Sequence, residues 1–536
     1  MKNCFAKLRC YVGGLNGVLL IIYTFLICLS GVLTRDLISL SYILTATIII
    51  GVMCFLICPL ILRFLAKVKL TSPAPVKNCS ARIKICNGLS AFVFTFIWFL
   101  CLYIIYYPGS FSPDSWSQYT QAITNEYNDW HPVLHTLLAF KLPLSLTGGW
   151  IGSVVLFQIL VLSAVLGYSF CVIRKYAGTK FTAICVAFVL LNPQLQVFAL
   201  YPWKDTAFVI CTILLLTFGL QIYLTKGEWV RRPVNTVGFV IAVVFTTLIR
   251  HNAVLFTIPF ALAILLCVTK KKGLILAVGA IVLFAGIKFP FYSVLNVEDP
   301  DQRQVETLGL PMTVIGTVVS QNPGSLDEET REFAYRVAPK EVWEEMFRDG
   351  SYNSVKWNVK TDNSVIEEYG RAKVISMMLR CFKSSPRQAL RGLIKLTEGV
   401  YSVTASSCTA MIPHIADNDY GITQTGIGSL QNLCCGYFFS ATEILGYAFA
   451  YLGVMHLLLI ASVLSKCKLS RRADWKRILF ILPVFAYNFG TSLLLTGAED
   501  IQRFFMYTFP VTPLLLLFIF HQNNERHTDI SVTEEV

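Results

Sequence analysis

Long, nearly uninterrupted apolar segments recur along the chain, and they limit its fold more than any other feature. A helix rises about 1.5 Å per residue, so roughly 20 apolar residues cross the hydrocarbon core of a bilayer. Only 14% of the residues are charged, against about a quarter in soluble globular proteins. We therefore predict an all-α integral membrane protein with about twelve transmembrane helices. The predicted spans are 11–33, 37–62, 88–107, 150–172, 181–199, 206–224, 235–250, 252–268, 273–290, 437–465, 478–496 and 504–520.

The placement of Lys and Arg predicts the orientation of these spans. With the N-terminus inside, the inner segments hold 25 Lys and Arg and the short outer segments hold 5. Short cytoplasmic loops carry such an excess, whereas long translocated loops are largely exempt. We therefore expect a multi-pass protein of a bacterial plasma membrane with both termini cytoplasmic. The net charge of +13 then reflects topology and contact with anionic lipids rather than binding of nucleic acid.

The spans divide the chain into five parts. A two-helix unit comes first, a core of seven spans follows, and a long extracytoplasmic insert separates this core from three closing helices and a short tail. Acidic residues, amphipathic runs and a proline at the start of 386–400 predict that the insert is mainly helical. The boundaries are 1–86, 88–290, 291–436, 437–520 and 521–536.

Polar residues collect in five clusters, all expected on the outer side. The first follows the third span and reads Pro-Gly-Ser-Phe-Ser-Pro-Asp-Ser, ending at Ser115. Pro113 and nearby aromatic residues restrict this loop, so it can hold the Asp114 carboxylate at the membrane rim as a general base or a metal ligand. The alternative is that Asp114 only caps a short helix beginning at Ser115.

The second cluster contains Trp130 and His131, followed by Pro132 and, four residues after the first histidine, His135. Two histidines four apart can share a helix face and bind a metal, but the glutamate of a zinc-protease motif is missing. We prefer the interpretation that Trp130 and His131 shape a pocket or bind a sugar or phosphate.

The third cluster is Tyr201-Pro-Trp203-Lys204-Asp205, at the start of a span. The helix dipole favours an aspartate there and disfavours a lysine. Lys204 is therefore either paired with a carboxylate or reserved for an anion, and Asp205 is a second candidate catalytic carboxylate.

The last two clusters are short. Arg250, His251 and Asn252 form a hairpin turn between two spans, and Glu499 and Arg503 begin the final span. Arginine suits bidentate recognition of phosphate, although interfacial anchoring is the alternative for the hairpin. Charged residues near hydrocarbon are costly and are functional candidates by default. We expect Asp114, Lys204, Arg250 and Arg503 to line one hydrated cavity at the outer rim, covered by 291–436.

Taken together, this layout resembles the GT-C superfamily of membrane glycosyltransferases, and more closely a bacterial group of multi-pass proteins with that architecture. The resemblance covers 88–290 and 437–520 well and the insert loosely. The residues that carry it are the loop around Asp114, Trp130-His131-Pro132, Tyr201 to Asp205, Arg250 to Asn252 and Arg503-Phe504.

The resemblance implies transfer of a sugar from a polyprenyl-phosphate donor to a cell-surface acceptor, with Asp114 as general base. It also implies that Lys204, Arg250 and Arg503 hold the lipid phosphate, and that Asp205 orients Lys204. No cofactor is assigned. A divalent metal stays an open alternative, weakened because Ser115 stands where a second acid is expected.

Two other functions remain open. A surface-glycan polymerase or ligase also combines about twelve spans with a large outer loop. A non-enzymatic transporter or flippase should instead show charged or broken helices near the bilayer midplane and an inverted repeat. Neither feature is apparent in the sequence, which favours the transferase.

Overall fold

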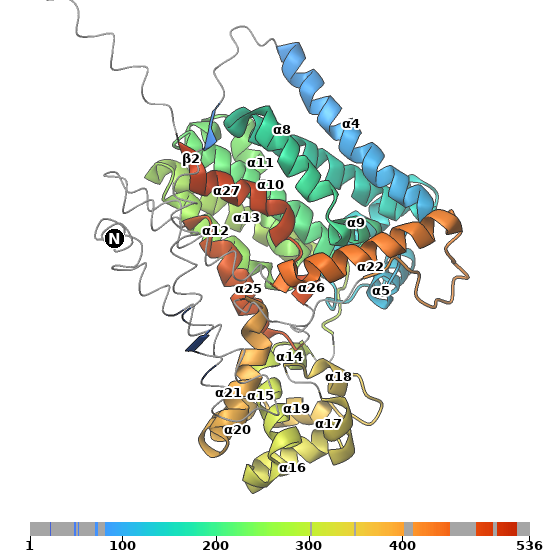
Figure 1. Ribbon diagram of the computed structural model, residues 1–536, viewed down its shortest axis with the longest axis vertical. Coiled ribbons are helices and arrows are strands. Elements are labelled where there is room, and N and C mark those ends of the chain that lie inside the picture. Colours follow the sequence, from blue (N-terminus) through green and yellow to red (C-terminus); the bar gives the residue numbers. More distant parts are fainter. Residues whose placement is uncertain are drawn as a thin grey trace, which may run out of the picture.

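The computed structural model describes residues 70–72, 81–300, 303–347, 350–400, 411–450, 479–496 and 501–522, with a few single positions between 22 and 52. Most of the predicted spans 11–33 and 37–62 and the second half of 437–465 lie outside the described residues. The described chain is almost entirely helical, as predicted. It forms an apolar helical bundle and a smaller helical lobe at one end of it (Figure 1).

The bundle is built from long apolar helices joined by short connections. Its main helices are α4 (Ala81–Ile105), α8 (Gly152–Leu190), α10 (Lys204–Leu224), α11 (Pro233–Ile249), α12 (Val254–Leu265), α13 (Lys270–Val294), α22 (Gly428–Ala450), α25 (Leu482–Leu494) and α27 (Thr508–Phe520). Shorter elements connect them: α5 (Pro113–Thr124), α6 (Val133–His135), η1 (Thr136–Lys141), α7 (Leu142–Leu146), α9 (Pro193–Leu200), η2 (Glu228–Arg231), η3 (His251–Ala253) and α26 (Ile501–Phe505).

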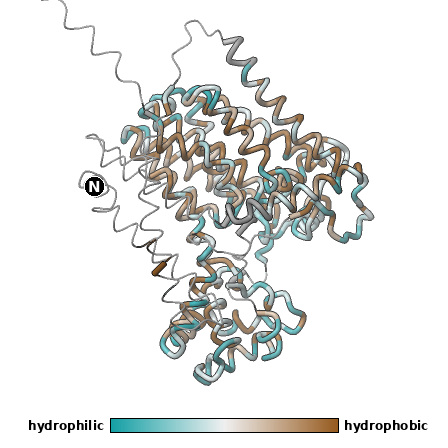
Figure 2. The backbone as a smooth tube through the Cα atoms, viewed as in Figure 1, coloured by the Kyte–Doolittle hydropathy of each residue, from teal (hydrophilic) through white to brown (hydrophobic). Residues whose placement is uncertain are grey.

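Five of the described helices are long and apolar enough to cross a membrane, and three shorter apolar helices accompany them. The five segments are Asn87–Ile105, Gly152–Leu190, Lys204–Leu224, Lys270–Val294 and Arg503–Phe520. Large apolar side chains stay exposed along the bundle; Val282 and Phe289 on α13 are 63% and 68% exposed. Figure 2 shows hydrophobic residues along these helices. Exposed apolar area of this extent is typical of a protein surrounded by lipid.

The predicted break between the spans 150–172 and 181–199 is present, but the second of these spans is not one helix. Element α8 consists of two helical limbs that meet at a kink at Gly178, between the two predicted spans. Gly178 has φ +80°, which a residue with a side chain rarely adopts, so glycine suits this kink. The second limb ends at Leu190, and Pro193 starts the separate, fully buried helix α9 because proline favours a first helical turn.

The lobe is formed by the insert and has its own hydrophobic core. Its helices are α14 (Arg303–Glu306), α15 (Gly309–Gln321), α16 (Glu328–Val337), α17 (Lys340–Met346), α18 (Asn353–Lys356), α19 (Ser364–Tyr369), α20 (Arg371–Ser384) and α21 (Pro386–Thr397), with η4 (Pro323–Ser325) and η5 (Glu398–Val400). Trp343, Phe333 and Met377 are fully buried at its centre. Hydrophilic residues are more frequent on this lobe than along the bundle (Figure 2). The described residues of this lobe are mainly helical.

After the lobe, residues 411–427 return to the bundle and run along the loop that follows α4. Phe111 pairs with Ile415 as an isolated bridge, and the Thr425 amide donates to the Tyr107 carbonyl at 2.9 Å. Gly426 lies against the Ile105 carbonyl so closely that any side chain would collide with it. This segment therefore fixes the loop between α4 and α5, which leads into the helical turn that carries Asp114.

The two ends of the bundle differ. Strands β1 (Leu70–Thr71) and β2 (His521–Gln522) pair in parallel at one end. Helices α5 and α26 lie at the other end, next to the lobe (Figure 1). The polar clusters singled out in the sequence meet at this second end.

Candidate functional site

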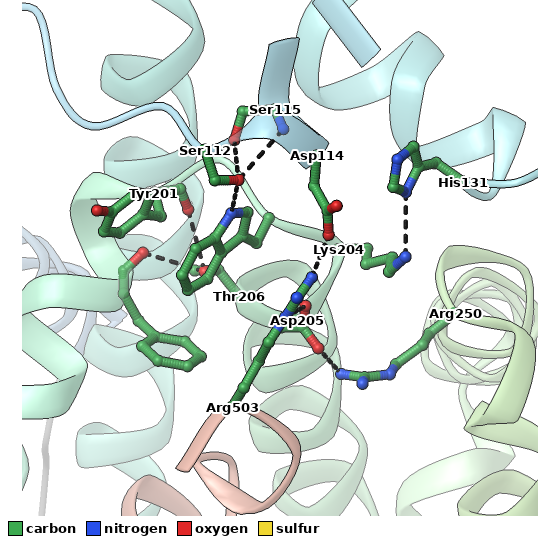
Figure 3. Close-up of polar contacts among 12 residues, drawn as sticks. Ser112, Asp114, Ser115, His131, Tyr201, Lys204, Asp205, Thr206, Arg250 and Arg503 are labelled. Carbon is green, nitrogen blue, oxygen red and sulfur yellow. Dashed lines mark hydrogen bonds and ion pairs between the residues drawn. The ribbon is translucent and has the colours of Figure 1, made fainter. Parts of the chain in front are cut away.

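The first functional side chain is presented by the N-terminus of α5. Ser112 is the N-cap, and its hydroxyl accepts from the Ser115 amide at 3.3 Å. Pro113 occupies the first helical turn, where its missing N–H costs nothing. The alternative interpretation of Asp114 as the cap is therefore wrong. Ser112 performs that function, and the Asp114 carboxylate instead contacts the Arg503 guanidinium (Figure 3).

Lys204 and Asp205 begin α10 directly after an extended Trp203. The Trp203 indole donates to the Ser112 hydroxyl at 2.6 Å, which ties the start of α10 to the start of α5. Two distant segments are thus held together, and both place charged side chains at the same point.

Arg503, from the short helix α26, bridges the two carboxylates. Its Nε donates to Asp205 at 2.9 Å, while another nitrogen of the same guanidinium contacts Asp114. Its charged carbon lies 5.1 Å from the centre of the Trp203 ring, a cation–π distance. The arginine is therefore held by two anions and one aromatic face (Figure 3).

Arg250 supplies a second cation for Asp205. It pairs with Asp205 and also donates through Nε to Asn252 at 2.8 Å. The side chains of Asp205 and Arg250 are 1% and 4% exposed, so this pair is almost fully removed from solvent. The expected orientation of Lys204 by Asp205 is not what the hydrogen bonds show, because Asp205 holds Arg250 and Arg503.

Lys204 turns towards His131, and its ammonium donates to His131 Nδ1 at 3.0 Å (Figure 3). Lysine has no acceptor, so this ring nitrogen must be unprotonated. Burial and the neighbouring Lys204 lower the pKa of His131 well below its ordinary value, which keeps the ring neutral at pH 7. His131 thus orients the lysine without adding charge.

The cluster carries more positive than negative charge. Asp114 and Asp205 face three cations, Lys204, Arg250 and Arg503. Burial alone would raise the pKa of Asp114, but the positive charges of Arg503 and Lys204 hold that pKa below its usual range. Asp114 and Arg503 are 33% and 24% exposed, so the excess positive charge is open to an incoming ligand.

Some predicted residues lie beside this cluster rather than in it. Tyr201 stacks on Trp203 with ring centres 4.2 Å apart and bonds to His414 of the returning segment. Trp130 faces the lobe, where the Lys356 ammonium lies 5.5 Å from its ring. Asn252 supports Arg250 and donates to Thr491. Glu499 lies outside the described residues.

His251 belongs to a second charged group that the sequence analysis did not single out. Its Nε2 lies 3.0 Å from the Asp129 carbonyl oxygen. The buried Asp129 carboxylate also pairs with Lys288 at 3.2 Å and accepts from Tyr292. A signal for this group was present, because Lys288 stands inside the predicted apolar span 273–290, where a charge needs a partner.

The surroundings of Asp114 already carry positive charge. Arg503 and Lys204 already supply positive charge beside its carboxylate, and Ser115 offers no second acid. Among the residues that the structure describes, no three His, Cys, Asp or Glu side chains gather in a metal-binding group.

No protein-family model and no curated protein matches the sequence. Among solved structures, the chain aligns with the crystal structure of ArnT from Cupriavidus metallidurans bound to undecaprenyl phosphate. The alignment covers 78% of each chain with 13% sequence identity and a TM-score of 0.29. At this TM-score the likeness does not establish a shared fold.

Proposed function

We propose that this protein is a GT-C-type membrane glycosyltransferase. It transfers a sugar from a polyprenyl-phosphate donor to a cell-surface acceptor on the outer face of the membrane. The observation that carries the proposal is the contact of one carboxylate, Asp114, with a cluster whose cations outnumber its anions at the end of an apolar bundle. An anionic head on an apolar tail fits this combination, because the head meets the cations while the tail stays in lipid.

Arg503 and Lys204 are the groups proposed to receive the donor phosphate. Arginine offers two parallel N–H donors to phosphate oxygens, and lysine adds a point charge. Arg250 is almost fully buried and bound to Asp205. It therefore holds Asp205 in place and adds positive charge to the site from a buried position. Asp205 in turn holds Arg503 in place through a 2.9 Å hydrogen bond.

Asp114 is the proposed general base. It takes the proton from an acceptor hydroxyl, whose oxygen then forms a bond to the anomeric carbon. The bond from that carbon to the phosphate oxygen breaks, and the polyprenyl phosphate leaves with the electron pair, stabilised by Arg503 and Lys204. In the unliganded site Asp114 is neutralised by Arg503 and is therefore a weak base. A phosphate that draws Arg503 away restores its basicity, which links proton transfer to a bound donor.

Substitution of Asp114 by Asn tests the proposal, since the change is nearly isosteric. A general base contributes about 10²- to 10⁴-fold to rate, so surface glycans of a deletion strain carrying Asp114→Asn should match those of the deletion itself. Purified Asp114→Asn protein should still bind undecaprenyl phosphate, and more tightly than wild type, because its competitor for Arg503 is gone. The matched control is Glu126→Gln, an exposed position beyond the end of α5, which should restore wild-type glycans.

Full activity of Asp114→Asn removes Asp114 from the base role. Movement of the donor lipid across vesicles without any new glycosidic bond would support the transporter instead. The membrane face is tested with cysteine at the exposed Glu126 position. A membrane-impermeant thiol reagent should label this cysteine in intact cells. Labelling only after the cells are lysed would place the site on the cytoplasmic face and contradict the proposal.

A further inference from the structure

A cavity of about 550 Å³ lies between α4 and the two limbs of α8. It is distinct from the Asp114 cluster because it begins at Asn87, near the opposite end of α4. Ile105, at the other end of α4, is 18 residues away, which corresponds to roughly 27 Å of helix. The two limbs of α8 meet at the Gly178 kink, and residues of both limbs line the cavity beside α4.

The length of the cavity matches one leaflet of a bilayer. Its lining on α4 runs from Asn87 to Trp98, 11 residues apart, or about 16 Å along the helix. Half of a hydrocarbon core of about 30 Å is about 15 Å. Much of the lining is apolar and includes Ala183, Val186 and the buried Leu190. At the rim, Phe94 and Leu191 are 55% and 52% exposed.

The mouth of the cavity is basic. Arg174 lines it and donates to the Asn87 side chain at 3.5 Å. Lys175 and Lys180, on either side of the Gly178 break, are exposed. Among the residues that the structure describes, no acidic side chain lines the cavity. A basic side chain at the headgroup level attracts anionic lipid, and an apolar groove of one-leaflet depth accepts its chain.

We propose that this cavity is a binding site for an anionic phospholipid, with one acyl chain between α4 and α8 and the headgroup phosphate on Arg174. This lipid site is separate from the proposed transferase centre, and the inference does not depend on the proposed function. Its occupant belongs to the leaflet at the β1–β2 end of the bundle, where the basic mouth lies. A bound lipid fills the space between the two limbs of α8 and so stabilises the kink at Gly178.

The test uses full-length protein in micelles that contain phosphatidylglycerol and phosphatidylcholine in equal amounts, with retained lipid counted by native mass spectrometry after partial delipidation. Wild type should retain phosphatidylglycerol preferentially. Arg174→Gln should lower the retained ratio of phosphatidylglycerol to phosphatidylcholine about fivefold, the effect of one basic group at the headgroup level. The matched control is Arg232→Gln, which removes an exposed charge from a different loop and should leave the ratio unchanged.

A second measurement does not depend on that charge. Phosphatidylglycerol with brominated chains should quench Trp98 fluorescence, so Trp98→Phe should remove a quenched component from the emission. Ala183→Trp, which fills the groove, should lower retention of the lipid. An unchanged lipid ratio in Arg174→Gln, an equal loss in Arg232→Gln, or quenching that is the same with and without Trp98 would each overturn the proposal.

Discussion

The bundle end and the lobe use the same charged residue types in opposite ways. In the lobe, Arg336 pairs with Glu368 on the surface, with side chains 41% and 57% exposed. At the bundle end, Arg250 pairs with Asp205 at 4% and 1% exposure. The lobe has an apolar core to hold it together, and exposed ion pairs such as this one add little to stability. The bundle end has buried charge where an apolar pair of similar volume would often be at least as stable.

This difference bears on function. A buried ion pair is weak evidence for stability, because the cost of removing two charges from water offsets their attraction. The group of Asp114, Asp205, Lys204, Arg250 and Arg503 is therefore better explained by a task that needs fixed charge at this place. The comparison makes a graded set of predictions about what each charge contributes to folding.

The largest effect is expected for Asp205→Asn. The change leaves Arg250 buried with no carboxylate and removes one of the two anions that hold Arg503. Breaking a buried pair from one side costs about 3 to 5 kcal/mol, which a thermal unfolding midpoint in detergent will show. The double variant Asp205→Asn/Arg250→Met removes the stranded charge and should be more stable than the single one. A double variant that is less stable than the single variant would contradict the proposed difference between the bundle end and the lobe.

An intermediate effect is expected from His131, through pH. The folded protein keeps this imidazole neutral because its pKa is lowered well below the ordinary value, whereas the unfolded chain binds a proton below about pH 6.5. The unfolded state therefore holds more protons in mild acid, and the free energy of unfolding falls as pH falls. The loss is at most about 2 kcal/mol between pH 6.5 and 5.

His131→Gln is the matched variant for this titration. Its amide oxygen can accept from Lys204 as the imidazole nitrogen does, but it carries no titratable group. The pH slope of the unfolding midpoint should become shallower than that of wild type. An identical pH dependence of the unfolding midpoint in the two proteins would mean that water reaches His131 and that the site is more hydrated than its contacts indicate.

Much of this site can be predicted from the sequence, because charged residues are rare beside apolar membrane segments and are therefore easy to identify. Asp114, Lys204 and Arg503 stand at the ends of apolar runs, and the structure brings Arg503 into contact with Asp114 and the charge of Lys204 near that carboxylate. The sequence does not predict which residue each of these side chains contacts. Only the fold decides that Lys204 meets His131 rather than Asp205, since the two candidate partners lie on different segments.

The fold was predictable to a similar degree. Hydropathy identifies the helical class and most of the described apolar helices, and it predicts a break between residues 172 and 181. It does not show that this break is a kink at Gly178 with a positive φ, or that the second predicted span ends early and is followed by the separate helix α9. The contact of Trp130 with Lys356 was equally hidden, because nothing in either segment indicates which part of the insert packs on the bundle.

The smallest effect is expected in the lobe, for Glu368→Gln. Glu368 accepts two hydrogen bonds from Arg336, and the ion pair lowers the pKa of Glu368. Both side chains remain in water after the change, however, so neither is left unpaired in an apolar environment. The unfolding midpoint should not move measurably, and added salt should change it equally in the variant and in wild type. A loss as large as that of Asp205→Asn would show that exposure does not separate the two regions, and that the surface pairs hold the lobe together as much as its core does.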